Sequence, residues 1–279
     1  MGGSVRARWF TAALYMVGML IAGPAVAQTT GDPNPGAITL TGAMEASNAY
    51  LFRGIPQDDT GLILWPAADL GVALWSGGGS LTSIAVNVGL WNSLHTGLAG
   101  ADGPSRKLWY ESDFYATFGL GFNGGVSIAT TYTAYTSPNN AFASVKEVSV
   151  KVAAGGYGTR PYALVAFELE GQADGGVTKG RYLELGAAPG TTIAGVAVAV
   201  PVRVGLSLDG YYEGQRGDER FGFFSVGANV TVPLSSGASR YGSWNVHGGA
   251  DYVRLGDSNA LRLGDNQKVV ISAGIGFTY

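Results

Sequence analysis

Residues 269–279 read Val-Val-Ile-Ser-Ala-Gly-Ile-Gly-Phe-Thr-Tyr, and every second residue of this C-terminal stretch is apolar. One parity holds Val269, Ile271, Ala273, Ile275, Phe277 and Tyr279, and the other holds mostly small or polar residues. Successive side chains of a β-strand point to opposite faces, so this period of two predicts a strand with one apolar and one polar face.

The same pattern recurs along the chain; Trp244 and Val246, for example, alternate with Asn245 and His247. The period-two segments are 37–53, 61–75, 80–92, 108–122, 125–136, 143–154, 160–170, 179–188, 192–212, 220–234, 241–254 and 267–279. Each is long enough for a tilted strand that crosses a bilayer, which takes about 9–11 residues. We therefore expect about twelve strands, with ten or fourteen left open because 192–212 is overlong and the faces in 143–188 are less clean.

The connections between these segments alternate in length. Those at 76–79, 123–124 and 155–159 are tight, whereas 93–107 and 255–266 are long. In outer-membrane barrels the short turns are periplasmic and the long loops extracellular. The alternation predicts an antiparallel meander with its turns at one end and its loops at the other.

The N-terminal residues have the layout of an export signal. Arg6 and Arg8 precede an uncharged run from Trp9 to Gly23, and Ala25-Val26-Ala27 supplies small residues before Gln28. The alternative, a membrane-spanning helix, needs about 20 apolar residues, and this run is shorter. We predict a signal peptide at 1–27 and one domain at 28–279.

Composition favours a membrane protein built from strands. Only 13% of the residues are charged and 46% are hydrophobic, yet no segment after the signal reads as a spanning helix. In hydrocarbon every backbone N–H and C=O needs an internal partner, so strands can span only as a closed barrel. The fold class expected is all-β: a closed antiparallel transmembrane β-barrel.

Residue counts exclude several other classes of protein. The chain has no cysteine, which excludes disulfides, thiolate zinc sites and thiol catalysis. Its 20 acidic residues outnumber 17 basic ones, two of which lie in the signal, and this balance argues against binding to nucleic acid.

Aromatic residues gather near the ends of the predicted strands, where amphipathic rings would lie at the level of the lipid headgroups. This set contains Trp65, Trp75, Trp91, Trp109, Trp244, Tyr50, Phe52, Tyr110, Tyr211 and Phe221. The alternative is a soluble β-sandwich, but a sandwich would bury its large aromatics in the middle of strands.

The segment Ser47-Asn48-Ala49-Tyr50-Leu51-Phe52-Arg53-Gly54-Ile55 resembles the signature of the TorF-like porins, a family of proteobacterial outer-membrane β-barrels. Short segments at 182–186, 200–202, 221–224 and 241–244 are also similar to that family, so the resemblance spans most of the chain after the signal. Pro56 departs from the usual polar residue after the signature. The resemblance implies the barrel more strongly than it implies a substrate.

Strand parity assigns a set of ionisable residues to the inner face. The predicted pore-lining residues are Glu45, Arg53, Asp69, Glu111, Asp113, Glu147, Lys151, Glu184, Arg203, Asp209, His247 and Asp251. Two interpretations remain open: the charges pair across the barrel and plug it, or they line a wet lumen whose acidic excess attracts cations.

The sequence gives little support for catalysis or a metal site. A serine hydrolase needs a base beside its nucleophile, and the chain has two histidines. We place His95 in a loop and His247 on the inner face, where His247 is better explained as a structural residue that bonds to its neighbours. The loop acids Asp58, Asp59, Asp102, Asp257 and Asp265 lack the spacing of a dedicated calcium site.

We therefore expect a porin-like channel in the outer membrane of a Gram-negative bacterium, passing small solutes with a preference for cations and using no cofactor. The alternative is a closed barrel with a structural, adhesive or surface-binding role in loops 93–107 and 255–266, and an outer-membrane hydrolase ranks third. The expected partners are outer-membrane lipid and lipopolysaccharide, small solutes, and the barrel assembly machinery, which would engage the C-terminal strand ending in Phe277 and Tyr279.

Overall fold

The computed structural model describes residues 36–101, 106–214, 217–234 and 241–279. The predicted signal peptide at 1–27 lies outside these residues, as does Asp102.

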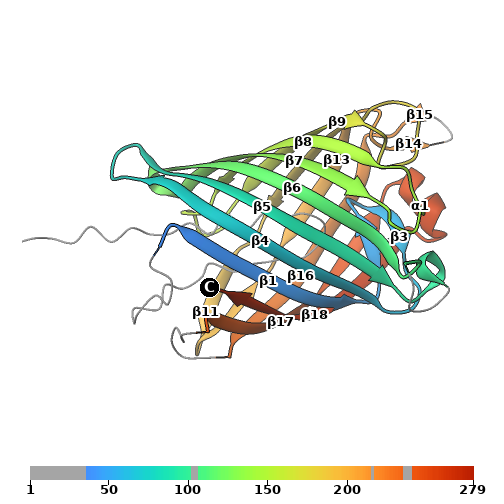
Figure 1. Cartoon of the computed structure of the whole chain (residues 1–279). Helices are drawn as coiled ribbons and strands as arrows, with labels where there is room; N and C mark the ends of the chain where they lie inside the picture. The colour runs from blue at the N-terminus through green and yellow to red at the C-terminus, as the bar shows by residue number, and fades with distance from the viewer. Residues whose placement is uncertain (1–35, 102–105, 215–216, 235–240) are drawn as a thin grey trace, which may run out of the picture.

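The described residues form a closed antiparallel β-barrel of twelve strands, as predicted (Figure 1). The strands are β1 (Ile38–Ser47), β4 (Ile63–Ser76), β5 (Leu81–His95), β6 (Trp109–Phe122), β7 (Val126–Thr136), β8 (Val145–Ala154), β9 (Tyr162–Glu170), β10 (Arg181–Ala187) continued by β11 (Gly190–Ile193), β12 (Val196–Ala199) continued by β13 (Val202–Asp209), β16 (Phe221–Pro233), β17 (Ser243–Leu255) and β18 (Gln267–Thr278).

Two of the twelve strands are interrupted beside a proline. Pro189 separates β10 from β11, and Pro201 lies between β12 and β13. Proline has no N–H to give to the ladder, but its carbonyl still accepts, from Val200 N–H at 2.8 Å and from Gly227 N–H at 2.9 Å respectively. The sheet therefore remains continuous across both breaks.

The last strand closes the barrel against the first. β18 pairs with β1 from Ser272 opposite Ser47 to Thr278 opposite Thr41. Tyr279 and Leu40 then exchange two backbone hydrogen bonds of 2.7 and 2.8 Å. Closure leaves neither strand with a free edge, which a strand-built membrane protein requires.

One end of the barrel carries short turns and the other carries long loops (Figure 1). The turn end has the connections 77–80, 123–125 (helix η2), 155–161 and 194–195, together with the C-terminus. Ala194 and Gly195 both have positive φ, 50° and 83°, as a two-residue hairpin turn requires. This turn lies inside the segment 192–212 predicted as one strand, so that boundary was wrong.

The loop end holds the remaining elements, which are β2 (Tyr50–Phe52), β3 (Ile55–Asp58), η1 (Leu98–Gly100), β14 (Glu213–Gly214), β15 (Gly217–Asp218) and α1 (Asp257–Leu263). α1 is fixed at the barrel rim: Ser258 N–H donates to Glu219 at 2.7 Å, and Asn259 Nδ2 donates to the Gly222 carbonyl at 3.1 Å.

The outer surface is apolar along the strands. Leu40, Leu70, Leu90, Phe114 and Ile271 are all exposed, and all have the outward parity of their strands. An apolar outward band is the surface that a lipid-facing wall needs. No helix among the described residues is long and apolar enough to cross a membrane.

The predicted aromatic girdle is only partly correct. Trp75, Trp109, Trp244 and Phe221 are exposed at strand ends, as a girdle requires. The other six residues of that set are buried on the inside: Trp65, Trp91, Tyr50, Phe52, Tyr110 and Tyr211. An aromatic ring near a strand end can face lipid or lumen, and here most of them fill the lumen.

The first predicted strand, 37–53, is also shorter than expected. β1 ends at Ser47, whose side chain accepts from Ala49 N–H at 3.4 Å and donates to the Ala49 carbonyl at 2.8 Å. These local bonds turn the chain away from the sheet. Residues 50–58 form a separate hairpin instead of the end of a barrel strand.

Candidate functional site

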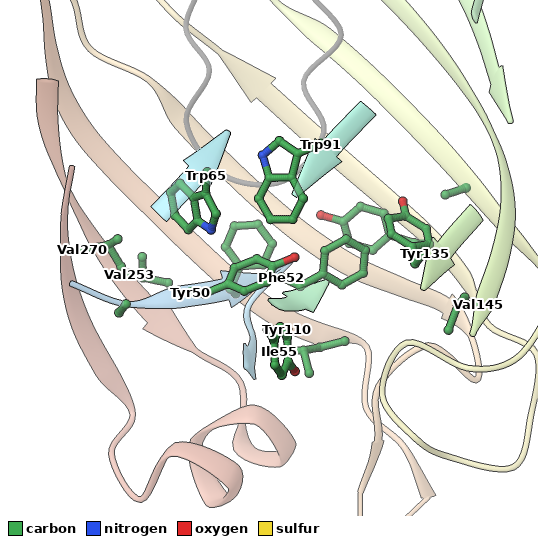
Figure 2. Close-up of a cluster of buried hydrophobic side chains, with 14 of the residues drawn as sticks. Tyr50, Phe52, Ile55, Trp65, Trp91, Tyr110, Tyr135, Val145, Val253 and Val270 are labelled. Atoms are coloured by element: carbon green, nitrogen blue, oxygen red, sulfur yellow. The ribbon is translucent and has the colours of Figure 1, made fainter. Parts of the chain in front are cut away.

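The hairpin β2–β3 lies inside the loop end of the barrel. Its residues Tyr50, Phe52 and Ile55 are buried, and Figure 2 shows them among side chains that come from the surrounding wall. A hairpin loop outside the barrel would leave such residues in water. The hairpin thus acts as a plug, defined here as residues 50–58.

The wall opposite the plug is built from aromatic rings. The Tyr50 ring lies 5.6 Å from both Trp65 and Trp91, centroid to centroid, and 6.4 Å from Tyr110. Phe52 packs edge-on against Tyr135 at 5.2 Å. Such pairs contribute about 0.5–1.5 kcal/mol each beyond the area that they bury, so the plug is held firmly at this end.

Arg53, at the tip of the plug, crosses the lumen to the opposite wall. Its two terminal nitrogens contact the two carboxylate oxygens of Glu147 at 2.6 and 2.7 Å, and Glu147 is on β8, five strands from β1. A third hydrogen bond, of 2.8 Å, joins Arg53 to the Tyr211 hydroxyl. Burial alone would lower the pKa of Arg53, but the Glu147 carboxylate raises it above its ordinary value.

The turn at the tip fits closely against the wall. Arg53 and Gly54 both have positive φ, 50° and 83°, and a Cβ at Gly54 would lie 2.8 Å from Phe223 Cβ. The Tyr212 hydroxyl donates to the Arg53 carbonyl at 2.8 Å. Only glycine fits at position 54, whereas Arg53 adopts a backbone conformation that is unfavourable for its type.

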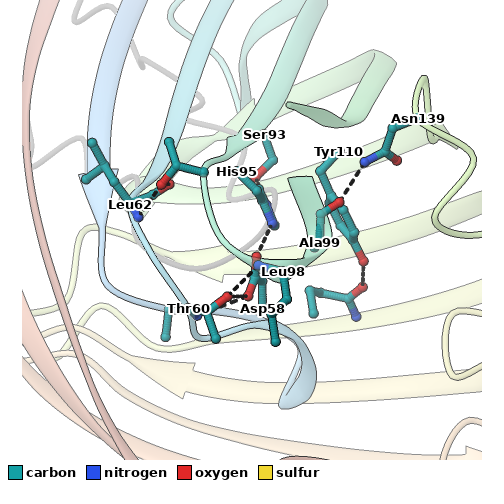
Figure 3. Close-up of polar contacts among 12 residues, drawn as sticks. Asp58, Thr60, Leu62, Ser93, His95, Leu98, Ala99, Tyr110 and Asn139 are labelled. Atoms are coloured by element: carbon teal, nitrogen blue, oxygen red, sulfur yellow. Dashed lines mark hydrogen bonds and ion pairs between the residues drawn. The ribbon is translucent and has the colours of Figure 1, made fainter. Parts of the chain in front are cut away.

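The base of the plug is joined to β5 by a chain of polar contacts (Figure 3). His95 Nδ1 lies 2.9 Å from Asp58 Oδ2, and His95 Nε2 lies 2.7 Å from Ser93 Oγ. Trp65 Nε1 donates to the same Ser93 oxygen at 2.9 Å. His95 is thus the last residue of a strand and faces inward, so its predicted place in a loop was wrong.

This chain has the order of a serine hydrolase triad but not the access that one needs. Ser93 and His95 are 0% exposed, and His95 stacks on Tyr110 with a centroid distance of 4.2 Å. A nucleophile must reach a substrate carbonyl beside donors for the developing oxyanion. In this arrangement Trp65 covers the Ser93 oxygen, so the contacts fix the plug and present no nucleophile.

Most of the residues predicted to line a pore lie on the inner face of barrel strands. These are Glu45, Asp69, Glu111, Asp113, Glu147, Lys151, Glu184, Arg203, His247 and Asp251. Two of the twelve lie elsewhere: Arg53 is on the plug, and the Asp209 side chain is exposed at a strand end, 3.8 Å from Arg181.

Several of the inward carboxylates accept hydrogen bonds from polar side chains on the same strand or an adjacent one. Glu45 accepts from Ser272 at 2.5 Å, and Asp69 accepts from Asn87 at 2.7 Å. Glu184 accepts from two hydroxyls, those of Tyr162 and Tyr182, each at 2.6 Å. Glu45 and Asp69 are thus held by neutral donors, whereas Glu184 also interacts electrostatically with Lys151 and Arg203.

The remaining inward groups are less well satisfied. Arg203 lies 3.6 Å from Asp251, and His247 Nδ1 lies 2.9 Å from Asn245. Both carboxylate oxygens of Asp113 are buried without a hydrogen-bond partner among the described residues. Buried acids without partners need water or protonation, and Asp113 lies on the inner face between its register partners Trp91 and Tyr135.

Small residues line part of the inner face toward the turn end. Gly119 on β6 is flanked in register by Ala85 on β5 and Ala129 on β7. A Cβ at Gly119 would meet nothing closer than the Ala85 carbonyl oxygen at 3.9 Å. There is therefore space for a side chain beside Gly119 on the inner face.

Two of the loop acids are engaged in contacts within the protein. Asp58 and Asp59 are occupied, by His95 and by Lys268 Nζ at 2.7 Å respectively. In the part of the chain that the structure describes, no group of three or more His, Cys, Asp or Glu residues is placed to hold a metal ion.

The contacts of Asp58 predict how the plug responds to acid. Burial alone would raise the pKa of Asp58, but donation from Thr60 Oγ1 and N–H and from His95 lowers it below 3.8. The folded protein then binds this proton less tightly than the unfolded chain, so the stabilisation is complete above pH 3.8 and is lost as the pH falls through the lowered pKa.

We therefore expect Asp58→Asn to be about 2 kcal/mol less stable than the wild type at pH 7, with the difference shrinking below pH 3.8. Thermal unfolding of both proteins in detergent across this range measures it. A difference that stays constant at low pH would contradict the assignment.

No family model and no characterised protein matches this chain in sequence. Solved structures of outer-membrane barrels are similar in fold. The Salmonella typhi outer membrane phospholipase dimer with bound calcium is 9% identical, covering 85% of this chain and 90% of that one, with a TM-score of 0.47.

The NalP autotransporter translocator domain from Neisseria meningitidis is 12% identical, covering 89% of this chain and 90% of that one, with a TM-score of 0.43. The NanC porin is 8% identical, and the match covers 86% of this chain and 99% of that one, with a TM-score of 0.43. At such identities the likeness concerns the fold alone.

Proposed function

We propose that this protein is an outer-membrane channel for small solutes with a preference for cations, and that the plug closes its loop end in the conformation described above. The observation that carries the proposal is the contrast between the two halves of the lumen. Aromatic rings fill the loop half, whereas the inner face toward the turn end carries small residues such as Ala85, Gly119 and Ala129.

Barrel size is compatible with a narrow pore. Twelve strands about 4.8 Å apart and tilted by about 40° give a backbone radius of about 12 Å. Inward tyrosine and tryptophan rings can close a cylinder of this radius, and inward glycine and alanine leave room for water. Whether the channel conducts then depends on the plug more than on strand number.

The charges of the inner face favour cations. Seven acids of the predicted set lie on this face, against the bases Lys151, Arg203 and the plug residue Arg53. Fixed carboxylates along a water-filled wall concentrate cations and repel anions.

The proposed orientation follows from the two ends of the barrel. The long loops would face the cell surface and the short turns the periplasm, with lipid and lipopolysaccharide against the apolar wall. The β18 strand, with Phe277 near its end, would be the segment that engages the barrel assembly machinery. The proposal includes no catalytic step and no cofactor.

A second candidate function has its own support. The loop end is well packed: Arg262 on α1 donates to the Asp174 carbonyl at 2.5 Å and the Glu213 carbonyl at 3.3 Å. An ordered cap of this kind is what a closed barrel with a structural, adhesive or surface-binding role would also need.

Recordings in planar bilayers separate the two functions. We expect stepwise conductance from the purified folded protein, with reversal potentials in a salt gradient that indicate cation preference. Gly119→Trp is expected to lower the step size, because its side chain enters the turn half of the lumen.

The matched control is Phe118→Trp, the adjacent residue on β6, which faces outward. It should leave the step size unchanged. Absence of any conductance, both from the folded wild type and from a folded barrel without the plug, would refute the channel and favour the surface role.

A further inference from the structure

The guanidinium of Arg53 lies in a cage that mostly belongs to the barrel and its loops. Arg53 Cζ is 4.5 Å from the centroid of the Tyr182 ring and 5.6 Å from that of Tyr211. The Glu147 carboxylate meets the guanidinium with two parallel contacts, and the Tyr135 hydroxyl donates to Glu147 at 3.5 Å. Among the described rings around the cation, Phe52, at 5.1 Å, comes from the plug itself.

These groups are the ones that recognise a flat organic cation. A carboxylate that faces a guanidinium in a fork accepts two charge-assisted hydrogen bonds, and aromatic faces attract the delocalised positive charge. Glu147 is 2% exposed and Tyr182 is 0% exposed, so both act with little screening by water. Three wall groups therefore form a complete cation site without any help from the plug.

Arg53, which occupies the cage, has an unfavourable backbone conformation. Arg53 has a φ of 50°, a left-handed conformation that is costly for a residue with a side chain. The cage residues Glu147 and Tyr182 lie on β8 and β10, and Tyr211 follows β13, so all three are outside that strained turn. A free cation would make the same contacts without the backbone strain.

Removal of Arg53 from the cage would leave a site that favours the binding of another cation. Glu147 would remain buried without its charge partner, and an uncompensated buried carboxylate is strongly unfavourable. The nearby Glu168, also buried on the inner face, adds to the negative potential at Tyr211.

We propose that Glu147, Tyr182 and Tyr211 form a binding site for the guanidinium group of a small solute, and that Arg53 is a tethered occupant that such a solute displaces. Displacement removes the bond that holds the tip of the plug to the far wall. The inference rests on the proposed function for the route by which the solute arrives, but binding itself requires no membrane.

The test is rescue of the full-length Arg53→Ala variant, folded in detergent, by millimolar ethylguanidinium chloride. Its melting temperature should rise with concentration and reach a plateau. Urea, a flat neutral analogue of guanidinium, and sodium chloride at the same concentrations should give no such rise. The double variant Arg53→Ala, Glu147→Gln should bind about tenfold more weakly, because the fork of charged hydrogen bonds is lost.

A response that is equal in the single and double variants, or that does not saturate, overturns the proposal. If Arg53→Ala folds poorly, the measurement becomes the yield of folded barrel in ethylguanidinium compared with the yield in urea. A higher yield in ethylguanidinium supports the site, and equal yields overturn it. Rescue in a protein that never conducts would uphold the site and refute the channel, whereas conductance without rescue would refute the site alone.

Discussion

A barrel in which a short Gly-Ser linker replaces residues 49–59 is expected to conduct several-fold more current per channel than the wild type. The plug places Tyr50, Phe52 and Ile55 in the loop half of the lumen, so its removal takes these buried side chains out of the path. The linker can be short, because Ser47 and Ile63 are register partners on adjacent strands. Barrel closure by β1 and β18 does not involve the plug.

Single-channel recording measures this effect, with circular dichroism of the same preparation to show that the strands are intact. The matched control shortens the connection 155–161 at the turn end, which contacts neither the plug nor its aromatic wall, and its conductance should equal that of the wild type. A plugless barrel with wild-type conductance would show that the hairpin does not close the pore.

The second large effect is expected from Glu147→Gln. The change leaves the Arg53 guanidinium buried without its carboxylate, and removing one partner of a buried pair costs about 3–5 kcal/mol. We expect a clear fall in melting temperature and frequent channel openings, because the tip of the plug is no longer fixed to β8.

Glu170→Gln is the control for Glu147→Gln. Glu170 forms an ion pair of the same 2.6 Å length with Lys146, but the two side chains are 61% and 42% exposed. Exposed pairs contribute about 0–1 kcal/mol, so this variant should melt near the wild type. Equal effects of the two substitutions would contradict the importance of burial at Glu147.

The barrel was predictable from the sequence because its physics is local. A wall with lipid on one side and polar groups on the other imposes a period of two on every strand, and tight turns mark the ends. The segment 192–212 exceeded a strand because the turn at Ala194 and Gly195 has no polar residues to mark it.

The plug was not predictable in the same way. Tyr50 and Phe52 continue the alternating pattern of β1, so in the sequence they look like the aromatic end of the same strand. One available signal pointed inward: Trp65 has the parity of Asp69, which the inner-face assignment already used. Parity should have outweighed the general preference of tryptophan for the headgroup level.

The polar chain at His95 shows a different limit. Ser93 and His95 share the inward parity of β5. Extending the predicted strand 80–92 by three residues would have placed both side chains next to each other on the inner face. Asp58 comes from a distant loop, and only the inward fold of the hairpin brings it to the imidazole. Contacts between an inserted loop and a wall depend on tertiary packing, which a single sequence does not encode in any periodic form.

The paired indoles of Trp65 and Trp91, 5.9 Å apart and both touching Tyr50, give this molecule an intrinsic optical reporter. Departure of the hairpin would hydrate both rings at once and shift their emission to longer wavelength, while the outward tryptophans keep their surroundings. Occupancy of the lumen can thus be followed in real time on unlabelled protein, in micelles or vesicles, from light that the chain itself emits.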